Sequence, residues 1–328
     1  MGQVFVTRRV PGRAVELLQG AGHDVAVWPD DLPPPANALR ESLLQADAAL
    51  TMVTDPIGQD LLIEAERLCV VANMAVGYDN IDIVAASQAG VWATNTPGVL
   101  HETTADLAFA LLLAAARNVV LSDRDTRDGG WQMWSPTAFL GPDPFGATIG
   151  IVGLGEIGQA VARRAHGFGM TVLAATRTSR PGIEQELGVE KVSLNDLLQR
   201  ADFVSLHVPY SPVTEHLIGS QELAVMKETA ILVNTARGGV VDQDALVEAL
   251  RAGTIGGAAL DVTVPEPLPL THPLYGFPNV IITPHIGSAS FATRAHMAEM
   301  AARNIVAVLG GAEPLNPVNQ PPVPRNRA

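Results

Sequence analysis

Three residues with chemically versatile side chains, Arg237, Glu266 and His285, each lie just beyond an apolar run of the sequence. An imidazolium ion can deliver a proton to the alkoxide that forms when hydride is transferred to a carbonyl group, and a carboxylate against its other nitrogen would hold the ring in place. The planar fork of a guanidinium group suits the carboxylate and the neighbouring carbonyl oxygen of a 2-oxo acid. Together these side chains could act as acid/base (His285), its orienting partner (Glu266) and substrate clamp (Arg237) in hydride transfer.

Each of the three also has a simpler interpretation. An arginine can form a surface salt bridge, an acid between prolines can be a solvated loop residue, and His285 is one of eight histidines. The surrounding pattern favours a functional role, because apolar segments at 203–208, 230–234, 256–260 and 279–283 are predicted to be strands of a parallel sheet. Ligands of such sheets bind beyond the carboxyl ends of the strands, which is where Arg237, Asp261 and His285 are placed.

A glycine-rich turn between a predicted strand and a predicted helix gives a second indication. Thr148–Val152 is the strand, the turn reads Gly153-Leu-Gly155-Glu-Ile-Gly158, and a second strand follows the helix at Met170–Ala175. In a βαβ unit this G-x-G-x-x-G spacing provides a tight turn, close approach of the backbone to a pyrophosphate, and close packing of helix on strand. The N-terminus of the helix then presents its free N–H groups to the phosphates. The context predicts a dinucleotide site, with a glycine-rich turn of some other α/β protein as the alternative.

The residues after the second strand of this unit bear on which dinucleotide binds. An NAD site places Asp or Glu there to accept from the ribose 2′-OH, whereas this chain has Thr176 followed by Arg177, Thr178, Ser179 and Arg180. Guanidinium and hydroxyl groups bind a 2′-phosphate, which a carboxylate would repel. We therefore expect NADP(H) to be preferred and NAD(H) to be possible, with a solvated basic loop as the simpler interpretation.

Composition limits the classes of partner. The 328 residues carry 34 acidic and 21 basic side chains, and this net charge of −13 argues against a nucleic-acid surface. A single cysteine, Cys69, rules out an intramolecular disulfide and fits a reducing compartment. No signal-like segment precedes the first predicted strand, and the longest apolar run is too short to cross a bilayer. We expect two domains in a cytoplasmic protein without a membrane partner.

The rest of the chain is organised around these motifs. Residues 1–96 alternate predicted strands and helices, a rhythm typical of a parallel α/β domain. Residues 102–117 are predicted to form a long helix that is apolar nearly all round and therefore buried. Residues 129–144 carry two of the four tryptophans among glycines and prolines, which is typical of an interface or a pocket lid, although packing on the same domain is the alternative. From Pro314 onward an extended tail is predicted.

Six segments together resemble the D-isomer-specific 2-hydroxyacid dehydrogenase family, and specifically its glyoxylate/hydroxypyruvate reductase branch. The resemblance covers nearly the whole chain and is carried by residues 70–82 (VVANMAVGYDNID), 94–100 (TNTPGVL), 153–158 (GLGEIG), 231–238 (ILVNTARG), 261–267 (DVTVPEP) and 283–288 (TPHIGS). It implies an α/β fold of two doubly wound parallel-sheet domains, Rossmann-type for the cofactor and flavodoxin-like for the substrate, with a cleft between them. The substrate-binding domain would be residues 1–98 plus 287–328, and the Rossmann domain residues 99–286.

The resemblance also assigns roles to individual residues. It implies a homodimer formed through an arm at about residues 102–144, in which Trp134 closes the partner's substrate pocket, and a catalytic set of Arg237, Glu266 and His285. The substrate carboxylate would be held by backbone N–H groups of Val76 and Gly77, and the implied substrate-binding residues are Val76, Gly77, Trp134, Arg237, His285 and Ser288. The motif and the resemblance together give as cofactor-binding residues Thr104, Gly153, Leu154, Gly155, Glu156, Ile157, Gly158, Thr176, Arg177, Thr178, Arg180, Val208, Pro209, Thr214, Thr235, Ala236, Arg237, Asp261, His285 and Gly287.

Two features depart from the family's pattern. The ribose acid is missing at Thr176, as in NADPH-preferring members, and Thr263 stands where an aromatic residue is more usual. The expected activity is reduction of glyoxylate or hydroxypyruvate with NADPH. One alternative is an NAD-dependent dehydrogenase of D-lactate, phosphoglycerate or phosphite type, against which the missing acid and Trp134 count. Another is a non-catalytic, nucleotide-sensing corepressor, which would not need the intact catalytic set.

Overall fold

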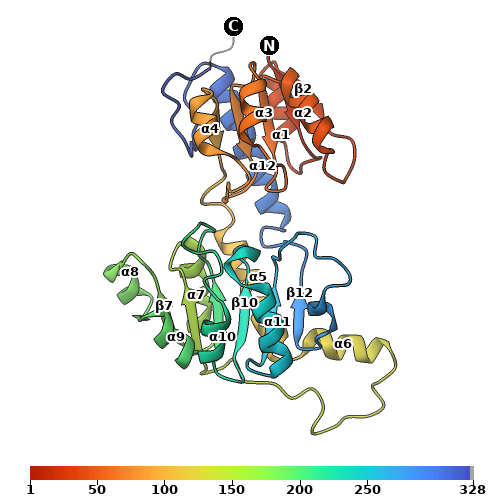
Figure 1. The fold of residues 1–328 in the computed structure, drawn as a ribbon, viewed down its shortest axis with the longest axis vertical. Helices are drawn as coiled ribbons and strands as arrows, with labels where there is room; N and C mark the ends of the chain where they lie inside the picture. Colours follow the sequence, from red (N-terminus) through yellow and green to blue (C-terminus); the bar gives the residue numbers. More distant parts are fainter. Residues whose placement is uncertain (326–328) are drawn as a thin grey trace. The chain divides into compact units, whose positions relative to one another are not determined.

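The computed structural model describes residues 1–325 and divides into two compact units (Figure 1). The first consists of Met1–Leu100 together with the C-terminal part of the chain from Ser288, and the second is His101–Gly287. Residues 99–100 thus fall in the first unit and Gly287 in the second, one or two residues from the boundaries expected from the sequence. Each unit contains a single parallel sheet with helices on its faces, which confirms the predicted α/β class.

The first unit is built on a five-stranded parallel sheet in the order β2-β1-β3-β4-β5, the flavodoxin-like order. Strands β3 and β4 are buried along their whole length, which explains why they read as continuous apolar runs. The strands are β1 (Gln3–Val6), β2 (Asp24–Val27), β3 (Ala48–Thr51), β4 (Val70–Asn73) and β5 (Trp92–Thr94), and the helices are α1 (Ala14–Gly20), α2 (Ala36–Gln45), α3 (Gln59–Glu64), α4 (Ile83–Gln88) and α12 (Phe291–Leu309).

Helix α12 returns the chain to this unit after the second unit is complete. It spans 19 residues and contacts α1, β3 and β4. The hydroxyl of Ser290 accepts from the backbone N–H of Thr293 at 3.1 Å and so caps its first turn. No element was predicted here from the sequence, although Ser290 is a recognisable N-cap residue.

The predicted extended tail is seen over residues 314–325, where the chain is extended but bound to the sheet; residues 326–328 lie outside the described residues. The backbone N–H of Val318 donates to the carbonyl of Ala93 at 2.9 Å, and that of Arg325 donates to the carbonyl of Gly90 at 2.7 Å. These bonds cover the outer edge of β5, which would otherwise expose unpaired backbone groups. The segment therefore belongs to the first unit and is not a free tail.

The second unit contains a seven-stranded parallel sheet in the order β12-β11-β10-β9-β6-β7-β8. The chain enters at β6, extends the sheet through β7 and β8, and then crosses to the other side of β6 with β9. The order therefore reverses between β6 and β9, which is where ligands bind in doubly wound sheets. The strands are β6 (Thr148–Val152), β7 (Thr171–Ala175), β8 (Val189–Lys191), β9 (Phe203–Leu206), β10 (Ile231–Asn234), β11 (Gly257–Leu260) and β12 (Val280–Ile282). The helices are α5 (His101–Ala116), α6 (Val119–Arg127), α7 (Glu156–Gly167), α8 (Pro181–Glu186), α9 (Leu194–Arg200), α10 (Ser220–Val225) and α11 (Gln243–Ala252), with short 3-10 helices η1 (Gly238–Val240) and η2 (Pro273–Gly276).

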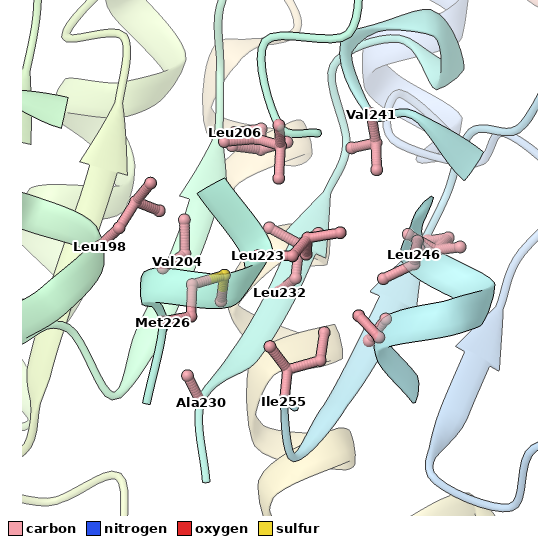
Figure 2. Packing of buried hydrophobic residues seen from close by; sticks show 14 of the residues in the cluster. Leu198, Val204, Leu206, Leu223, Met226, Ala230, Leu232, Val241, Leu246 and Ile255 are labelled. Atoms are coloured by element: carbon pink, nitrogen blue, oxygen red, sulfur yellow. The ribbon is translucent and has the colours of Figure 1, made fainter. Parts of the chain in front are cut away.

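Two apolar layers hold this sheet in place. Helices α9, α10 and α11 pack on one face of the sheet, and in this layer Leu206 of β9, Leu223 of α10 and Leu246 of α11 are at most 1% exposed (Figure 2). Helices α5 and α7 supply the other layer, and α5 contributes Phe109 and Leu112 to it. Because α5 contacts α7, β10 and β11, it is covered on several sides. This confirms the prediction that the long apolar helix is buried.

Helices α5 and α6 meet at a bend of 63°. The bend lies at Asn118, which has a left-handed backbone (φ 52°) and whose side-chain amide donates to the carbonyl of Leu140 at 3.0 Å. Within residues 1–325 no single helix is long and apolar enough to cross a membrane; this bent pair passes the same test by length and composition alone.

The segment that follows α6, residues 128–147, forms no helix or strand, as predicted. Four of its large apolar side chains are mostly exposed to solvent. Trp131, Met133, Trp134 and Leu140 each leave 70% to 80% of their surface exposed. The alternative that this loop buries its aromatic residues on its own domain is therefore wrong for both tryptophans.

Candidate active site

The turn between β6 and α7 gives each glycine of the motif a distinct place. Gly153 has a φ of +99°, and a Cβ atom there would lie 2.8 Å from the carbonyl oxygen of His207. A Cβ atom at Gly158 would lie 2.1 Å from the carbonyl oxygen of Gly153, so α7 can approach the turn only because this residue lacks a side chain. Apart from its own chain neighbours, none of the residues 1–325 has an atom within 4 Å of the Cβ position of Gly155, which leaves its backbone open to a ligand.

The start of α7 completes a cradle for a pyrophosphate. Gly155 is the N-cap residue, and no side chain of the described part of the chain caps the helix. The N–H groups of the first turn are thus available to an anion, and the dipole of the helix favours negative charge there. Because β6 also borders the switch point of the sheet, residues 153–158 fit the pyrophosphate of a dinucleotide.

The loop after β7, where the ribose of the adenosine is expected, is contacted by an acidic side chain from the following helix, which the sequence of the loop does not predict. Thr176 donates through its hydroxyl to the carbonyl of Thr178 at 3.3 Å. The carboxylate of Glu184, in the first turn of α8, folds back over the loop. It accepts from the hydroxyl of Ser179 at 3.0 Å and from the backbone N–H of Arg180 at 2.7 Å. The loop is therefore not purely basic.

His285 and Glu266 are in direct contact at the carboxyl edge of the sheet, meaning the loops that follow the carboxyl ends of its strands. Nδ1 of His285 lies 2.8 Å from Oε2 of Glu266, while Oε1 of Glu266 accepts from the backbone N–H of Thr263 at 3.1 Å. Both carboxylate oxygens are thus engaged. Since Nδ1 faces the carboxylate, a proton there leaves Nε2 as the ring nitrogen that can serve a substrate.

Asp261, at the end of β11, fixes the turn that carries His285. His285 has a positive φ of 54°. Asp261 accepts from the hydroxyl of Thr283 at 2.6 Å and from the backbone N–H groups of Ile286 at 2.9 Å and Gly287 at 2.8 Å. Burial raises the pKa of the Asp261 carboxyl, against the opposing effect of these donors. Asp261 was predicted to bind the cofactor, and the contacts seen here give it a role in positioning the turn.

Arg237 lies on the same edge, between β10 and η1. Its Nη1 donates to the carbonyl of Ala236 at 2.9 Å. A Cβ atom at the next residue, Gly238, would lie 2.2 Å from the carbonyl oxygen of Thr263, so the turn that bears Arg237 is in close contact with the loop that bears Glu266. The strand order β12-β11-β10 thus brings the three catalytic candidates to the ends of neighbouring strands.

Several other predicted residues lie at this edge, although their contact with a cofactor stays a prediction. Val208 and Pro209 follow β9, and the hydroxyl of Thr214 donates to the carbonyl of Pro209 at 2.7 Å, which closes the loop on itself. Thr104 of α5 adjoins Gly287, since a Cβ atom at Gly287 would lie 3.5 Å from its hydroxyl oxygen. The buried hydroxyl of Thr235, directly after β10, has no hydrogen-bond partner among the residues described.

In the first unit, the loop after β4 contains Val76 and Gly77. Asn95 donates to the carbonyl of Val76 at 2.8 Å, and Asn73 donates to the carbonyl of Gly77 at 3.0 Å. The first of these bonds orients the peptide group that carries the N–H of Gly77. The backbone N–H of Thr96 donates to the carbonyl of Ala75 at 2.8 Å and so orients the peptide group that carries the N–H of Val76. These two N–H groups are predicted to hold a substrate carboxylate. Ser288 precedes the N-cap of α12, and its carbonyl accepts from the backbone N–H of Ser290 at 2.8 Å.

A family model described as D-isomer specific 2-hydroxyacid dehydrogenase, NAD binding domain, matches residues 109–287, more than half of the chain. The chain belongs to this family. The glycine cradle, the His285–Glu266 pair and Arg237 all lie within the second unit, which contains the matched region.

Similarity to full-length relatives shows which branch of the family the chain resembles most. A glyoxylate reductase from Korarchaeum cryptofilum is 51% identical over 97% of this chain and 96% of its own length. A protein of known structure from Thermus thermophilus is 49% identical, with a TM-score of 0.91 over 96% of this chain and 99% of that one. An NADPH-dependent glyoxylate/hydroxypyruvate reductase from Sinorhizobium meliloti, solved in complex with citrate, is 33% identical, with a TM-score of 0.84 over 99% of this chain and 100% of that one. These similarities confirm the resemblance to the glyoxylate reductase branch.

Two residues of this dehydrogenase position the site without having been singled out as site residues from the sequence. Asn234, at the end of β10, donates to the carbonyl of Arg237 at 2.9 Å and accepts from the backbone N–H of Ala236 at 3.0 Å. Thr263 holds Glu266 through its backbone N–H, and its hydroxyl donates to the carbonyl of Pro265 at 2.9 Å. The signal for Asn234 was a polar residue that ends an otherwise apolar strand, whereas Thr263 stood out from the sequence only as a departure from the family's pattern.

His207 is a third residue of the dehydrogenase at this edge that was not assigned from the sequence, and its environment predicts a pH dependence of stability. Although the residue as a whole is only partly buried, its Nδ1 atom is shielded from solvent and has no partner in the described part of the chain, while Nε2 lies 2.8 Å from the hydroxyl oxygen of Ser205. Burial lowers the pKa of His207 from 6.5 to about 3. Between these values only the unfolded chain binds the proton, so the free energy of unfolding falls as the pH drops below 6.5.

Replacing His207 with glutamine should remove that dependence. The free energy of unfolding, measured with urea, should fall between pH 7 and pH 5 by up to about 2 kcal/mol more in wild type than in the variant, since one pKa unit corresponds to about 1.4 kcal/mol. Equal pH slopes for the two proteins would show that His207 is protonated in the folded state as readily as in the unfolded one.

Proposed function

We propose that this protein reduces a small 2-oxo acid, glyoxylate or hydroxypyruvate, to the 2-hydroxy acid with hydride from NADPH. The observation that carries the proposal is the 2.8 Å contact between His285 and Glu266 at the sheet edge that also bears Arg237. Relatives named glyoxylate reductase, about half identical over nearly the full length, support it. When bound, the reduced nicotinamide supplies hydride to the carbonyl carbon, and the side chains manage the oxygen and the proton.

The chain's own residues stabilise the charge that develops on the substrate. The guanidinium of Arg237 offers a fork of N–H donors to the carboxylate and the carbonyl oxygen, which polarises the C=O bond. Protonated His285 donates from Nε2 to the alkoxide oxygen and becomes neutral, while Glu266 stabilises the charged ring before the transfer. In the oxidative direction, neutral His285 accepts the proton. Val76 and Gly77 would hold the substrate carboxylate through their N–H groups, as the family resemblance implies.

Consumption of NADPH, followed by its absorbance, tests this function. Glyoxylate or hydroxypyruvate should be reduced faster than pyruvate. Faster turnover of pyruvate would place the chain with D-lactate-type enzymes. If no 2-oxo acid causes oxidation, the corepressor alternative is favoured instead.

The preference for NADPH is a separate part of the proposal, supported by Arg177, Thr178 and Arg180 after β7 and by the threonine at position 176. We expect Arg177→Asp to raise the KM for NADPH about 10- to 100-fold, because a hydrogen bond to a charged group is worth about 1.5–3 kcal/mol and the new carboxylate repels the phosphate. The KM for NADH in the same variant serves as the control and should change little. An unchanged ratio of the two KM values would contradict the assignment, as would a wild-type KM that is lower for NADH.

A homodimer formed through the arm at residues 102–144 is also proposed. Its support is the group of exposed apolar side chains at Trp131, Met133, Trp134 and Leu140, which is typical of a protein–protein interface. In the dimer Trp134 would close the partner's substrate pocket. Sedimentation equilibrium should give twice the chain mass of 34.5 kDa, and a monomer would refute the assignment.

The cellular location follows from composition. Cys69 is the only cysteine and is buried, which is typical of proteins from a reducing compartment. We therefore propose a cytoplasmic enzyme. Its net charge of −13 counts against a nucleic-acid partner, and a small anionic substrate would be attracted by local arginines and not by the overall field.

A further inference from the structure

The loop that is proposed to hold the 2′-phosphate of NADPH already binds a carboxylate of the chain itself. The hydroxyl of Ser179 donates to both oxygens of Glu184, at 3.0 Å to Oε1 and 3.2 Å to Oε2. The backbone N–H of Arg180 donates to Oε1 at 2.7 Å. Glu184 lies in the first turn of α8 and is half-buried, so its carboxylate faces the loop.

These contacts oppose the basic character of the loop in two ways. A 2′-phosphate offers three acceptor oxygens, and in the proposed binding mode its donors would include the hydroxyl and the N–H that Glu184 occupies. A phosphate with nearly two negative charges is also repelled by a carboxylate a few ångströms away, whereas a ribose 2′-OH is neutral and can donate to one. The loop thus has a threonine, Thr176, at the position of the usual ribose acid. The acid Glu184, eight residues later in the chain, folds back onto the same loop.

We propose that Glu184 is a specificity-determining residue that competes with the 2′-phosphate for Ser179 and Arg180 and thereby limits the preference for NADPH over NADH. The inference rests on the proposed function, in which this loop binds the adenosine end of the cofactor. It predicts that a chain with an NADPH-type loop can still use NADH. It also predicts that removal of the single charge on Glu184 sharpens the preference for NADPH.

The test compares Glu184→Gln with Glu186→Gln by titrating each variant and wild type with NADPH and NADH and following cofactor fluorescence. Glutamine keeps an oxygen that can accept from the N–H of Arg180, so the first variant removes the charge and retains the cap of α8. Glu186 lies on the same short helix and is exposed, so its replacement removes the same charge from the same element. Titrations at about 10 mM and about 0.5 M salt separate charge repulsion from structural effects, because salt screens the former.

Glu184→Gln should lower the Kd of NADPH about 3- to 10-fold at low salt and leave that of NADH within about twofold, an estimate for a carboxylate near a phosphate in a solvated loop. The gain should shrink at high salt, and Glu186→Gln should leave the ratio of the two Kd values within about twofold. An unchanged or reversed ratio in Glu184→Gln, an equal shift in Glu186→Gln, or equal weakening of both cofactors would overturn the proposal.

These titrations need no 2-oxo acid, so they distinguish failure of this inference from failure of the proposed function. A protein that binds both cofactors and reduces no 2-oxo acid refutes the activity, and the effect of Glu184→Gln can still be measured. A wild type that binds NADH more tightly refutes the preference for NADPH, while the shift between wild type and Glu184→Gln still decides the role of Glu184.

Discussion

Replacing His285 with glutamine is expected to lower kcat for 2-oxo acid reduction by about 10²- to 10⁴-fold, the range typical of losing a general acid. Glutamine can still form a hydrogen bond with Glu266, but it cannot transfer a proton to the alkoxide. Because the glycine cradle at residues 153–158 is unchanged, the Kd of NADPH should stay within about twofold. Steady-state kinetics with glyoxylate and a fluorescence titration with NADPH measure the two quantities.

A matched control is available in His296, an exposed histidine on α12. His296→Gln should leave kcat within about twofold of wild type, as is usual for surface substitutions away from special features. If His285→Gln retains more than a tenth of the wild-type kcat at neutral pH, the proton reaches the alkoxide from another group and the role given to His285 is wrong.

Replacing Arg237 with lysine should lower kcat/KM for glyoxylate by about 10²- to 10³-fold, comparable to removing one preorganised donor from an oxyanion site. Lysine keeps the positive charge but lacks the planar fork, so it cannot address the carboxylate and the carbonyl oxygen together. The loss should therefore be large even in this conservative variant. Initial rates at substrate concentrations below KM measure it directly.

Arg251 provides the control for this substitution. It lies at the end of α11, where it pairs with Glu248 on the surface. Arg251→Lys should preserve kcat/KM within about twofold, since exposed ion pairs contribute little. If Arg237→Lys behaves like Arg251→Lys, the guanidinium fork has no part in substrate recognition, and Arg237 is a structural residue.

The sequence was sufficient for features whose position depends on the chain direction alone. All strands of the second unit are parallel, so a residue that directly follows an apolar strand must lie at the carboxyl edge. That rule placed Arg237 and His285 correctly, and the glycine spacing placed Gly153, Gly155 and Gly158 at the turn before α7. These predictions required neither distances nor contacts.

Contacts between loops could not be predicted in this way, because they depend on the path by which a short irregular segment folds back on its neighbours. Glu184 meets Ser179 and Arg180 through a six-residue helix that is too short to show a periodic pattern. The hydrogen bonds that position the site, such as the one from Asn234 to the carbonyl of Arg237, depend on the direction of a side chain at a strand end. Helix α12 did not stand out because its alanine-rich run gives weak contrast between its faces.

The most direct measurement of the central claim is a single turnover of glyoxylate with NADPH that carries deuterium at both C4 positions of the nicotinamide. One deuterium is expected on C2 of the glycolate formed, detected by mass spectrometry, and the hydroxyl proton should come from solvent. Glycolate without deuterium on C2 would contradict hydride transfer to a 2-oxo acid as the function of this site, as would the absence of any reduced product with both glyoxylate and hydroxypyruvate.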